Sequence, residues 1–189
     1  MIIFFLERNF KMKRIFLAFV LLIILASLAL SLVSCGEKGE FAAPSGMKTA
    51  SSEVADYYFY VPEDWTVDLA TKATGAYFSK NDPSSVSITA WEMEHSDDTI
   101  DDWWAVERAD IDLVFKNVEI VSEENVIIDE IYGKKFVYTA SLGENNYKIM
   151  QAAVKKDSSV YVFTYTSTTE NFDLHVEEAD AMIANLKIK

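Results

Sequence analysis

The chain has 189 residues, a formal net charge of −13 at pH 7, one cysteine and two histidines. This length corresponds to one domain of ordinary size with terminal appendages, and a single cysteine excludes a disulfide within the chain. The acidic balance disfavours binding to phosphate backbones, so no nucleic-acid partner is expected; it is typical of a solvated surface or of a protein with a cationic partner.

The N-terminal segment combines a basic cluster with a long apolar run. Lys11, Lys13 and Arg14 precede residues 15–35, none of which is charged. This is the arrangement of a secretory signal, in which the cations stay on the cytoplasmic side while the apolar part enters the bilayer. The start is either Met1 or Met12, and a start at Met12 gives a compact basic region in front of the apolar run.

The apolar run ends in Leu32, Val33, Ser34 and Cys35, and this stretch resembles the bacterial lipobox. In lipoproteins with that motif the cysteine thiol receives a diacylglyceryl group, and the peptide is cut just before the cysteine. The resemblance implies that a lipid on Cys35 holds the protein at the extracytoplasmic face of the cell membrane. An uncleaved transmembrane anchor is the alternative, because residues 15–33, at about 1.5 Å per residue, can span a bilayer core of about 30 Å.

Composition divides the chain into three parts. Residues 1–34 are predicted to be a lipoprotein signal peptide, and residues 35–52 the lipidated cysteine with a flexible tether. The tether is inferred from its Gly, Ser and Ala content and from the absence of a helical or strand period. Residues 53–189 are predicted to form the folded domain, which packing alone must hold together.

The first half of this domain begins with strands. In the last of them apolar residues alternate with more polar ones, which is the period of a half-buried strand. Trp65 follows a turn and is expected to enter the core. The strands are expected at residues 56–61, 76–80 and 84–91.

A helix is predicted over residues 99–117, where the hydrophobic period changes to that of an amphipathic helix. Thr99 and Asp102 have the spacing of a capping box at its start. Trp104 lies on the apolar stripe and is expected to be buried. Trp103 points about 100° away from that stripe, which makes it the speculative contact residue for a partner.

The second half of the domain is predicted to form antiparallel hairpins and a closing helix. The turns at residues 142–145 and 155–158 are too short for parallel crossovers. The last strand is apolar on both faces, which predicts a central position with cover on each side. The strands are expected at residues 118–121, 126–128, 134–141, 147–154 and 160–166, and the helix should bury Phe172, Val176, Ala179, Ile183 and Leu186.

The order of these elements resembles the PsbP-like superfamily. The resemblance rests on the aromatic opening at residues 57–62 with Trp65, the strand at residues 84–90 ahead of a long helix, and the strand at residues 161–165 before a C-terminal helix. This superfamily includes the extrinsic photosystem subunit, bacterial DcrB-like lipoproteins and a Ran-binding import factor.

The resemblance implies an α+β fold, in which an antiparallel sheet of about six or seven strands is flanked by two main helices in an α/β/α sandwich. It also implies an accessory or binding role more than catalysis. The partner is expected to be an unknown protein or small molecule, since members of the superfamily bind unrelated things.

The densest acidic stretch offers weak candidates for a metal site. Glu92, Glu94, Asp97 and Asp98 lie close together, and carboxylate oxygens are the ligands that calcium prefers. Their spacing is not that of an EF-hand, and helix capping and solubility explain them more simply. No metal and no cofactor is therefore assigned, and a cation-binding surface protein stays open as an alternative function.

Neither histidine belongs to a catalytic motif. His95 and His175 are far apart in sequence, and His175 lies beside the apolar stripe of the closing helix, where it is expected to face solvent. The sequence contains no phosphate-binding glycine loop, cysteine pair or nucleophile elbow, so an enzyme is not expected. The alternatives are an envelope-associated hydrolase that uses a carboxylate pair and a purely structural envelope component.

Overall fold

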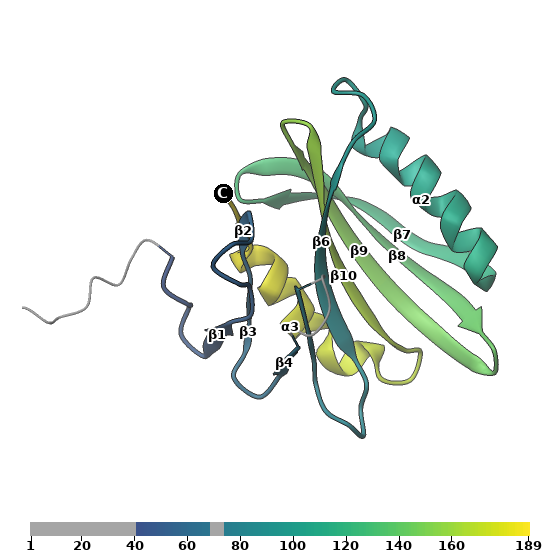
Figure 1. Ribbon diagram of the computed structural model, residues 1–189. Coiled ribbons are helices and arrows are strands. Elements are labelled where there is room, and N and C mark those ends of the chain that lie inside the picture. Colours follow the sequence, from purple (N-terminus) through teal and green to yellow (C-terminus); the bar gives the residue numbers. More distant parts are fainter. Residues whose placement is uncertain (1–40, 69–73) are drawn as a thin grey trace, which may run out of the picture. The chain divides into compact units, whose positions relative to one another are not determined.

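A seven-stranded antiparallel sheet forms the centre of the fold (Figure 1). Its strands are β4 (Thr66–Asp68), β5 (Thr74–Tyr77), β6 (Ser85–Glu92), β7 (Lys116–Ile128), β8 (Ile131–Leu142), β9 (Asn145–Lys156) and β10 (Ser159–Thr168). They lie in the order β4-β5-β6-β10-β9-β8-β7, and each neighbouring pair is antiparallel. The short turns of the sequence therefore form hairpins, as predicted.

The computed structural model describes residues 41–68 and 74–189, and residues Ala43–Lys189 form one compact unit. The predicted signal peptide, with the lipobox-like motif and Cys35, lies outside the described residues. In the described ranges no helix is long and apolar enough to cross a membrane.

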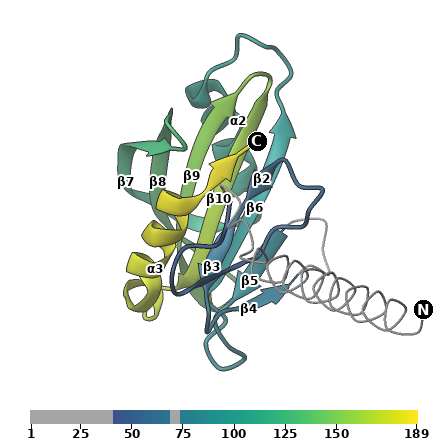
Figure 2. The same cartoon turned by 90° about the vertical axis from the view of Figure 1, so that its left-hand side faces the viewer.

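Two helices, α2 (Ile100–Val114) and α3 (Phe172–Asn185), cover opposite faces of the sheet (Figures 1 and 2). Side chains of α2 pack around Tyr138 on one face. Those of α3 pack around Phe163 on the other face, where the larger core cluster lies. This two-sided cover confirms the predicted α+β class and the sandwich arrangement.

α2 is positioned by its first turn and by a pair of stacked aromatic rings. Thr99 and Asp102 form the predicted capping box, in which each side chain accepts a hydrogen bond from the other residue's backbone N–H. Trp104, which was expected to be buried, is half-buried, and its ring stacks on Phe136 of the sheet with ring centroids 3.8 Å apart. The helix ends before the predicted residue 117, because the backbone is already extended at Phe115 and leads into β7.

β10 occupies the middle of the sheet, which agrees with its two apolar faces. Val160 and Val162 pack on the α2 side, in a cluster that includes Trp103. Tyr161 and Phe163 point to the other side and join the core under α3. The alternation of side chains along one strand therefore serves two separate cores.

The N-terminal part of the domain adds two small sheets. β1 (Met47–Thr49) pairs with β3 (Tyr60–Pro62), and β2 (Tyr57–Tyr58) pairs with β11 (Lys187–Ile188). The backbone N–H of Ala50 donates to the carbonyl oxygen of Phe59 at 2.8 Å, and both side chains are buried.

The compact unit therefore starts at Ala43, ten residues before the predicted domain start at Glu53. The predicted tether is too long at its C-terminal end. Its small residues suggested a linker, but Ala50 is small enough to be covered completely by the core.

β7 is one long strand at the edge of the sheet, where the sequence predicts two short ones at residues 118–121 and 126–128. The polar residues 122–125 continue the pairing with β8, and Val121 is the extra residue of a bulge. An edge strand faces solvent along one side, so a polar stretch can prolong it, and a bulge discourages pairing with another chain. The polarity of residues 122–125 indicates exposure and not a break.

Candidate functional site

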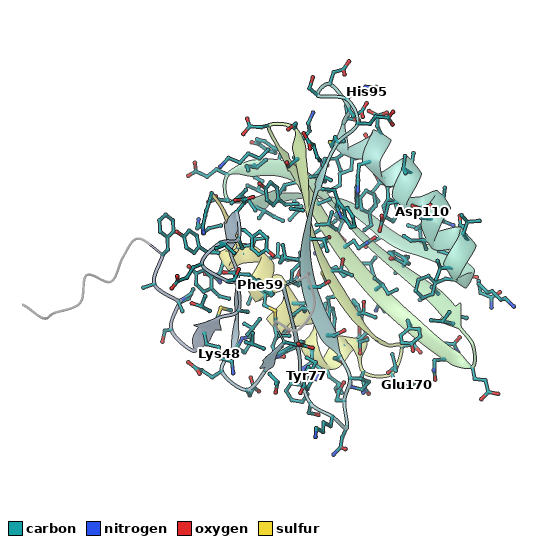
Figure 3. The ribbon with its side chains drawn as sticks, viewed as in Figure 1. Lys48, Phe59, Tyr77, His95, Asp110 and Glu170 are labelled. Carbon is teal, nitrogen blue, oxygen red and sulfur yellow. The ribbon has the colours of Figure 1, made fainter. Side chains whose placement is uncertain are left out.

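A pocket of about 480 Å³ lies where β6 ends, the following loop turns back and α2 begins. This volume falls within the usual range of small-molecule sites, about 300–1,000 Å³. Figure 3 labels His95 in this loop and Asp110 further along α2. Because Trp103, Ala105 and Val106 of α2 line the pocket, the site belongs to the α2 side of the sheet.

Two tryptophans dominate the apolar part of the pocket. Trp91, at the end of β6, is 57% exposed, and its indole N–H donates to Thr89 Oγ1 at 3.1 Å, which fixes the ring beside its strand. Trp103, near the start of α2, is half-buried because it packs on Val160. The remaining apolar residues of the lining are Met93, Ala105 and Val106.

Four carboxylates and one imidazole complete the lining, from Glu92, Glu94, His95, Asp98 and Asp102. Asp98 accepts a hydrogen bond from the backbone N–H of His95 at 3.1 Å. Hydrogen bonds from the hydroxyl and the backbone N–H of its capping-box partner hold the pKa of Asp102 below its ordinary value. The pocket therefore joins an aromatic surface to a strongly negative rim.

Lys155 holds the loop that forms the acidic side of the pocket. Its ammonium group donates to the carbonyl oxygens of Ser96 and Asp98, at 2.6 and 2.7 Å. Lys155 comes from β9, a strand paired on both sides, so the loop is tied to the rigid part of the sheet. The pocket is therefore shaped by contacts within the chain.

Of the five predicted site residues that lie in the described ranges, four meet in this pocket. Trp103, Glu92, Glu94 and Asp98 line it, whereas Asp97 does not. Within residues 41–68 and 74–189, no three side chains of His, Cys, Asp or Glu gather closely enough to hold a metal ion. The acidic stretch thus supplies charge to the pocket without forming such a group.

Sequence reasoning did not assign Trp91, His95 or Asp102 to the site. A signal for Trp91 exists in the alternation of β6, which places it on the same face as Thr89 and opposite the buried Ile88. A tryptophan on the polar face of a strand is a candidate contact residue.

A second polar cluster lies on the α3 side of the sheet. His175 is only 7% exposed, so the prediction that it faces solvent is wrong. Its Nδ1 lies 2.8 Å from Glu178 Oε2 and its Nε2 lies 3.2 Å from Asp82 Oδ2. Its ring packs against Trp65 and Phe78, with centroids 5.7 and 4.1 Å away. These distant segments cover an imidazole that its own helix would leave exposed.

Asp82 is the hub of this cluster. One oxygen accepts hydrogen bonds from the hydroxyl and the backbone N–H of Ser84, at 2.6 and 3.0 Å, and the Ser84 hydroxyl also meets that of Ser167 at 2.7 Å. Burial acts to raise the pKa of Asp82, but hydrogen bonds from Ser84, His175 and Asn171 outweigh it and leave the pKa below its ordinary value.

The contacts within this cluster hold elements of the fold together and do not form a catalytic triad. The Ser84 hydroxyl contacts Asp82 and Ser167 and not the imidazole, so it lacks the histidine base that activates a nucleophilic serine. Glu178 is held in addition by the indole N–H of Trp65, at 3.0 Å. The cluster fastens α3 to the sheet and to Trp65.

No family model matches the chain, and no curated protein matches it in sequence. Solved structures resemble it at low identity. Cyanobacterial PsbP from Synechocystis is 16% identical with a TM-score of 0.56, and the match covers 84% of this chain and 99% of that one. The Ran-binding protein Mog1p from Saccharomyces cerevisiae is 10% identical with a TM-score of 0.54, covering 75% and 95%. LpqN of Mycobacterium tuberculosis, which is involved in cell envelope biogenesis, is 11% identical with a TM-score of 0.52, covering 70% and 83%.

The chain has a PsbP-like fold. At these identities the likeness establishes the fold and leaves partner and activity to be argued from the site. The three proteins with the PsbP-like fold differ in what their names describe, from Ran binding to cell envelope biogenesis. In this chain an acidic, tryptophan-lined pocket lies between β6 and α2 and is the candidate binding surface.

Proposed function

We propose that this chain is an exported lipoprotein, held by a lipid on Cys35, whose PsbP-like domain acts as a binding or accessory module at the extracytoplasmic face of the cell membrane. In this proposal the pocket receives a cationic group of a small molecule or of a partner protein. The observation that carries the binding role is the exposed tryptophan surface of Trp91 surrounded by carboxylates. The lipobox-like motif supports the anchor.

Physical chemistry favours a cation in such a site. A cation over the face of a tryptophan gains about 0.5–1 kcal/mol at an exposed site and about 2 kcal/mol where water is excluded. The carboxylates of Glu92 and Glu94 have no ion pair with any described residue and add long-range attraction. The net charge of −13 draws cations towards the whole domain.

A binding role is proposed in preference to hydrolysis. A hydrolase of the expected kind would use a pair of carboxylates. The carboxylates of Asp82 and Glu178 converge on the α3 side of the sheet, but both are engaged with the ring of His175. LpqN shares the fold and is involved in cell envelope biogenesis, which is compatible with an accessory role at the envelope.

The proposal is tested by titrating the full chain, in detergent, with choline, methylguanidinium and spermidine while the indole N–H signals are followed by NMR. At least one cation should shift the signals of Trp91 and Trp103 in a saturable way. The signal of Trp65, which is buried on the α3 side, should not move and serves as an internal reference.

Two variants locate the site. Trp91→Ala should lower the affinity for the most tightly bound cation by about fivefold to thirtyfold, since it removes about 1–2 kcal/mol of cation–aromatic attraction. Tyr132→Ala removes an aromatic side chain that is 80% exposed and does not line the pocket, so its affinity should equal that of the wild type. If no cation shifts the two indole signals, or if both variants bind equally well, the pocket is not the site.

A further inference from the structure

We propose that the cationic group is a quaternary alkylammonium, a nitrogen that carries its positive charge on surrounding methyl groups. This statement deepens the proposed function and rests on it. The geometry distinguishes such a group from a metal ion, a primary ammonium and a guanidinium by what each would need from the pocket.

The lining provides carbon surface where the cation would sit. Trp91, Trp103, Met93 and Val106 are the large apolar contributors. A trimethylammonium group keeps little ordered water and gains dispersion and cation–aromatic attraction from such a surface. A primary ammonium is strongly hydrated and gives up hydrogen bonds to water when it is placed there.

Two of the four carboxylates in the lining, Asp98 and Asp102, already accept hydrogen bonds within the chain, through one oxygen each. Asp102 accepts two hydrogen bonds from Thr99, at 2.7 and 2.8 Å, and Asp98 accepts one from the backbone of His95. The loop carbonyls of Ser96 and Asp98 are held by Lys155. A guanidinium has five N–H groups to satisfy, whereas a quaternary ammonium has none.

The electrostatic field of the pocket favours a ligand that carries a positive charge and no negative charge close to it. The N-terminus of α2 carries roughly half a positive charge, which the carboxylate of Asp102 in its first turn opposes at the pocket, whereas Asp101 is paired with Lys134. None of the described lining residues is a lysine or an arginine, and the ammonium of Lys155, which holds the loop from outside the lining, is bound to the carbonyl oxygens of Ser96 and Asp98. Phosphocholine would bring its phosphate within two carbons of the ammonium and against Glu92 and Glu94, so the ligand is a quaternary ammonium free of an adjacent phosphate.

The test measures affinities of the full chain for choline, for the neutral isostere in which carbon replaces its nitrogen, for methylguanidinium, for phosphocholine and for calcium. Choline should bind at least about tenfold more tightly than the neutral isostere, which corresponds to about 1.4 kcal/mol for the charge. The affinity for choline should also be higher than the affinities for methylguanidinium and phosphocholine. Calcium should produce no shift of the indole signals.

Variants tie the preference to the pocket. Trp91→Phe should retain part of the choline affinity and Trp91→Ala should lose about fivefold to thirtyfold, while binding of the neutral isostere changes less. Glu94→Gln should lower the affinity for choline and leave the affinity for the neutral isostere unchanged. Tyr132→Ala is the matched control outside the pocket.

The outcomes separate this inference from the proposed function. If methylguanidinium or spermidine shifts the indoles of Trp91 and Trp103 and choline binds no better than its isostere, the quaternary preference is overturned while the cationic pocket stands. Equal affinity for choline and phosphocholine would overturn the exclusion of a lipid-type headgroup. If no cation reaches the pocket, both proposals fail.

Discussion

The clearest correction at the scale of single residues concerns His175. Both of its ring nitrogens lie within hydrogen-bond distance of a carboxylate, so both act as donors only when the imidazole is doubly protonated. Glu178 lies three positions away on the same helix, but Asp82 lies 93 positions earlier in the sequence. The hydrophobic period of a helix contains no information about a contact with a residue so far away in the sequence. This is why the sequence predicts that the ring of His175 is exposed.

Asp82→Asn should lower the free energy of unfolding at neutral pH by about 1.5–3 kcal/mol, because it replaces hydrogen bonds to a charged acceptor. The folded-state pKa of Asp82 lies below its ordinary value of 3.8, so its contribution is present above that value and is lost as the pH falls through the folded-state pKa. The difference between variant and wild type should therefore shrink as urea unfolding is repeated from about pH 7 down to about pH 3.

The control for this prediction is Asp110→Asn, which changes an exposed carboxylate on α2. Its unfolding free energy should run parallel to that of the wild type at every pH. A difference between Asp82→Asn and wild type that stays constant or grows on acidification contradicts the assigned role of the carboxylate.

At the candidate site, the lining residues that the sequence singled out are those where charged and aromatic residues cluster along the chain. Glu92, Glu94 and Asp98 are neighbours in the chain, and Trp103 follows them at the start of the next helix. The pocket also depends on Val160, which arrives through the pairing of β10 with β6. Such a contribution requires the strand order, which no local pattern contains.

At the scale of elements, the turn between β7 and β8 carries unusual backbone conformations. Asp129 and Glu130 have φ angles of 50° and 65°, in the left-handed region that favours glycine. Asp129 is held there by its side chain, which accepts hydrogen bonds from Lys187 Nζ at 3.0 Å and from the backbone N–H of Ile188 at 2.9 Å. The side chain of Glu130 is exposed.

Glu130→Gly should raise the free energy of unfolding by about 0.5–1 kcal/mol. A left-handed conformation costs an ordinary residue about 1–2 kcal/mol, and glycine removes that cost while losing more entropy on folding. Thermal and urea unfolding of the two chains measures the effect. Asp129→Gly is the paired variant and should be destabilised, since it also removes the bonds to Lys187 and Ile188; a destabilised Glu130→Gly would refute the account of the turn.

Elements with a strong period were predictable and edge elements were not. The helices and the strands β8, β9 and β10 have a buried side whose spacing appears in the sequence. β7 is exposed along much of its length, so its polar residues carry no period and the sequence breaks it into two. The turn at Asp129 and Glu130 was not named from the sequence, because Asp129 is followed by a glutamate and not by the glycine of the usual Asp-Gly pair.

At the scale of the whole molecule, the sheet separates the candidate site from the main core. The pocket lies on the α2 side, whereas His175, Asp82 and the larger hydrophobic cluster lie on the α3 side. Substitutions of exposed pocket residues therefore leave the main core untouched, and binding can be changed without unfolding the domain.

The proposed anchor gives a prediction for the complete chain in a bacterial host. Cys35→Ala should abolish incorporation of radioactive palmitate, because the thiol is the group that accepts the lipid. Ser34→Ala keeps a small residue before the cysteine and should still be labelled. Label that persists in Cys35→Ala would show that the lipid, if any, is attached elsewhere.

The pairing of β1 with β3 has a further consequence for this anchor. Since the compact unit begins at Ala43, only the seven residues 36–42 would separate a lipid on Cys35 from folded structure. Fully extended, they reach about 25 Å, which is less than the diameter of about 35–40 Å expected for a domain of this size. With the proposed lipid in place, so short a tether would keep the domain within its own diameter of the bilayer. Its effective concentration would then be high towards partners in the same membrane and low towards partners further away.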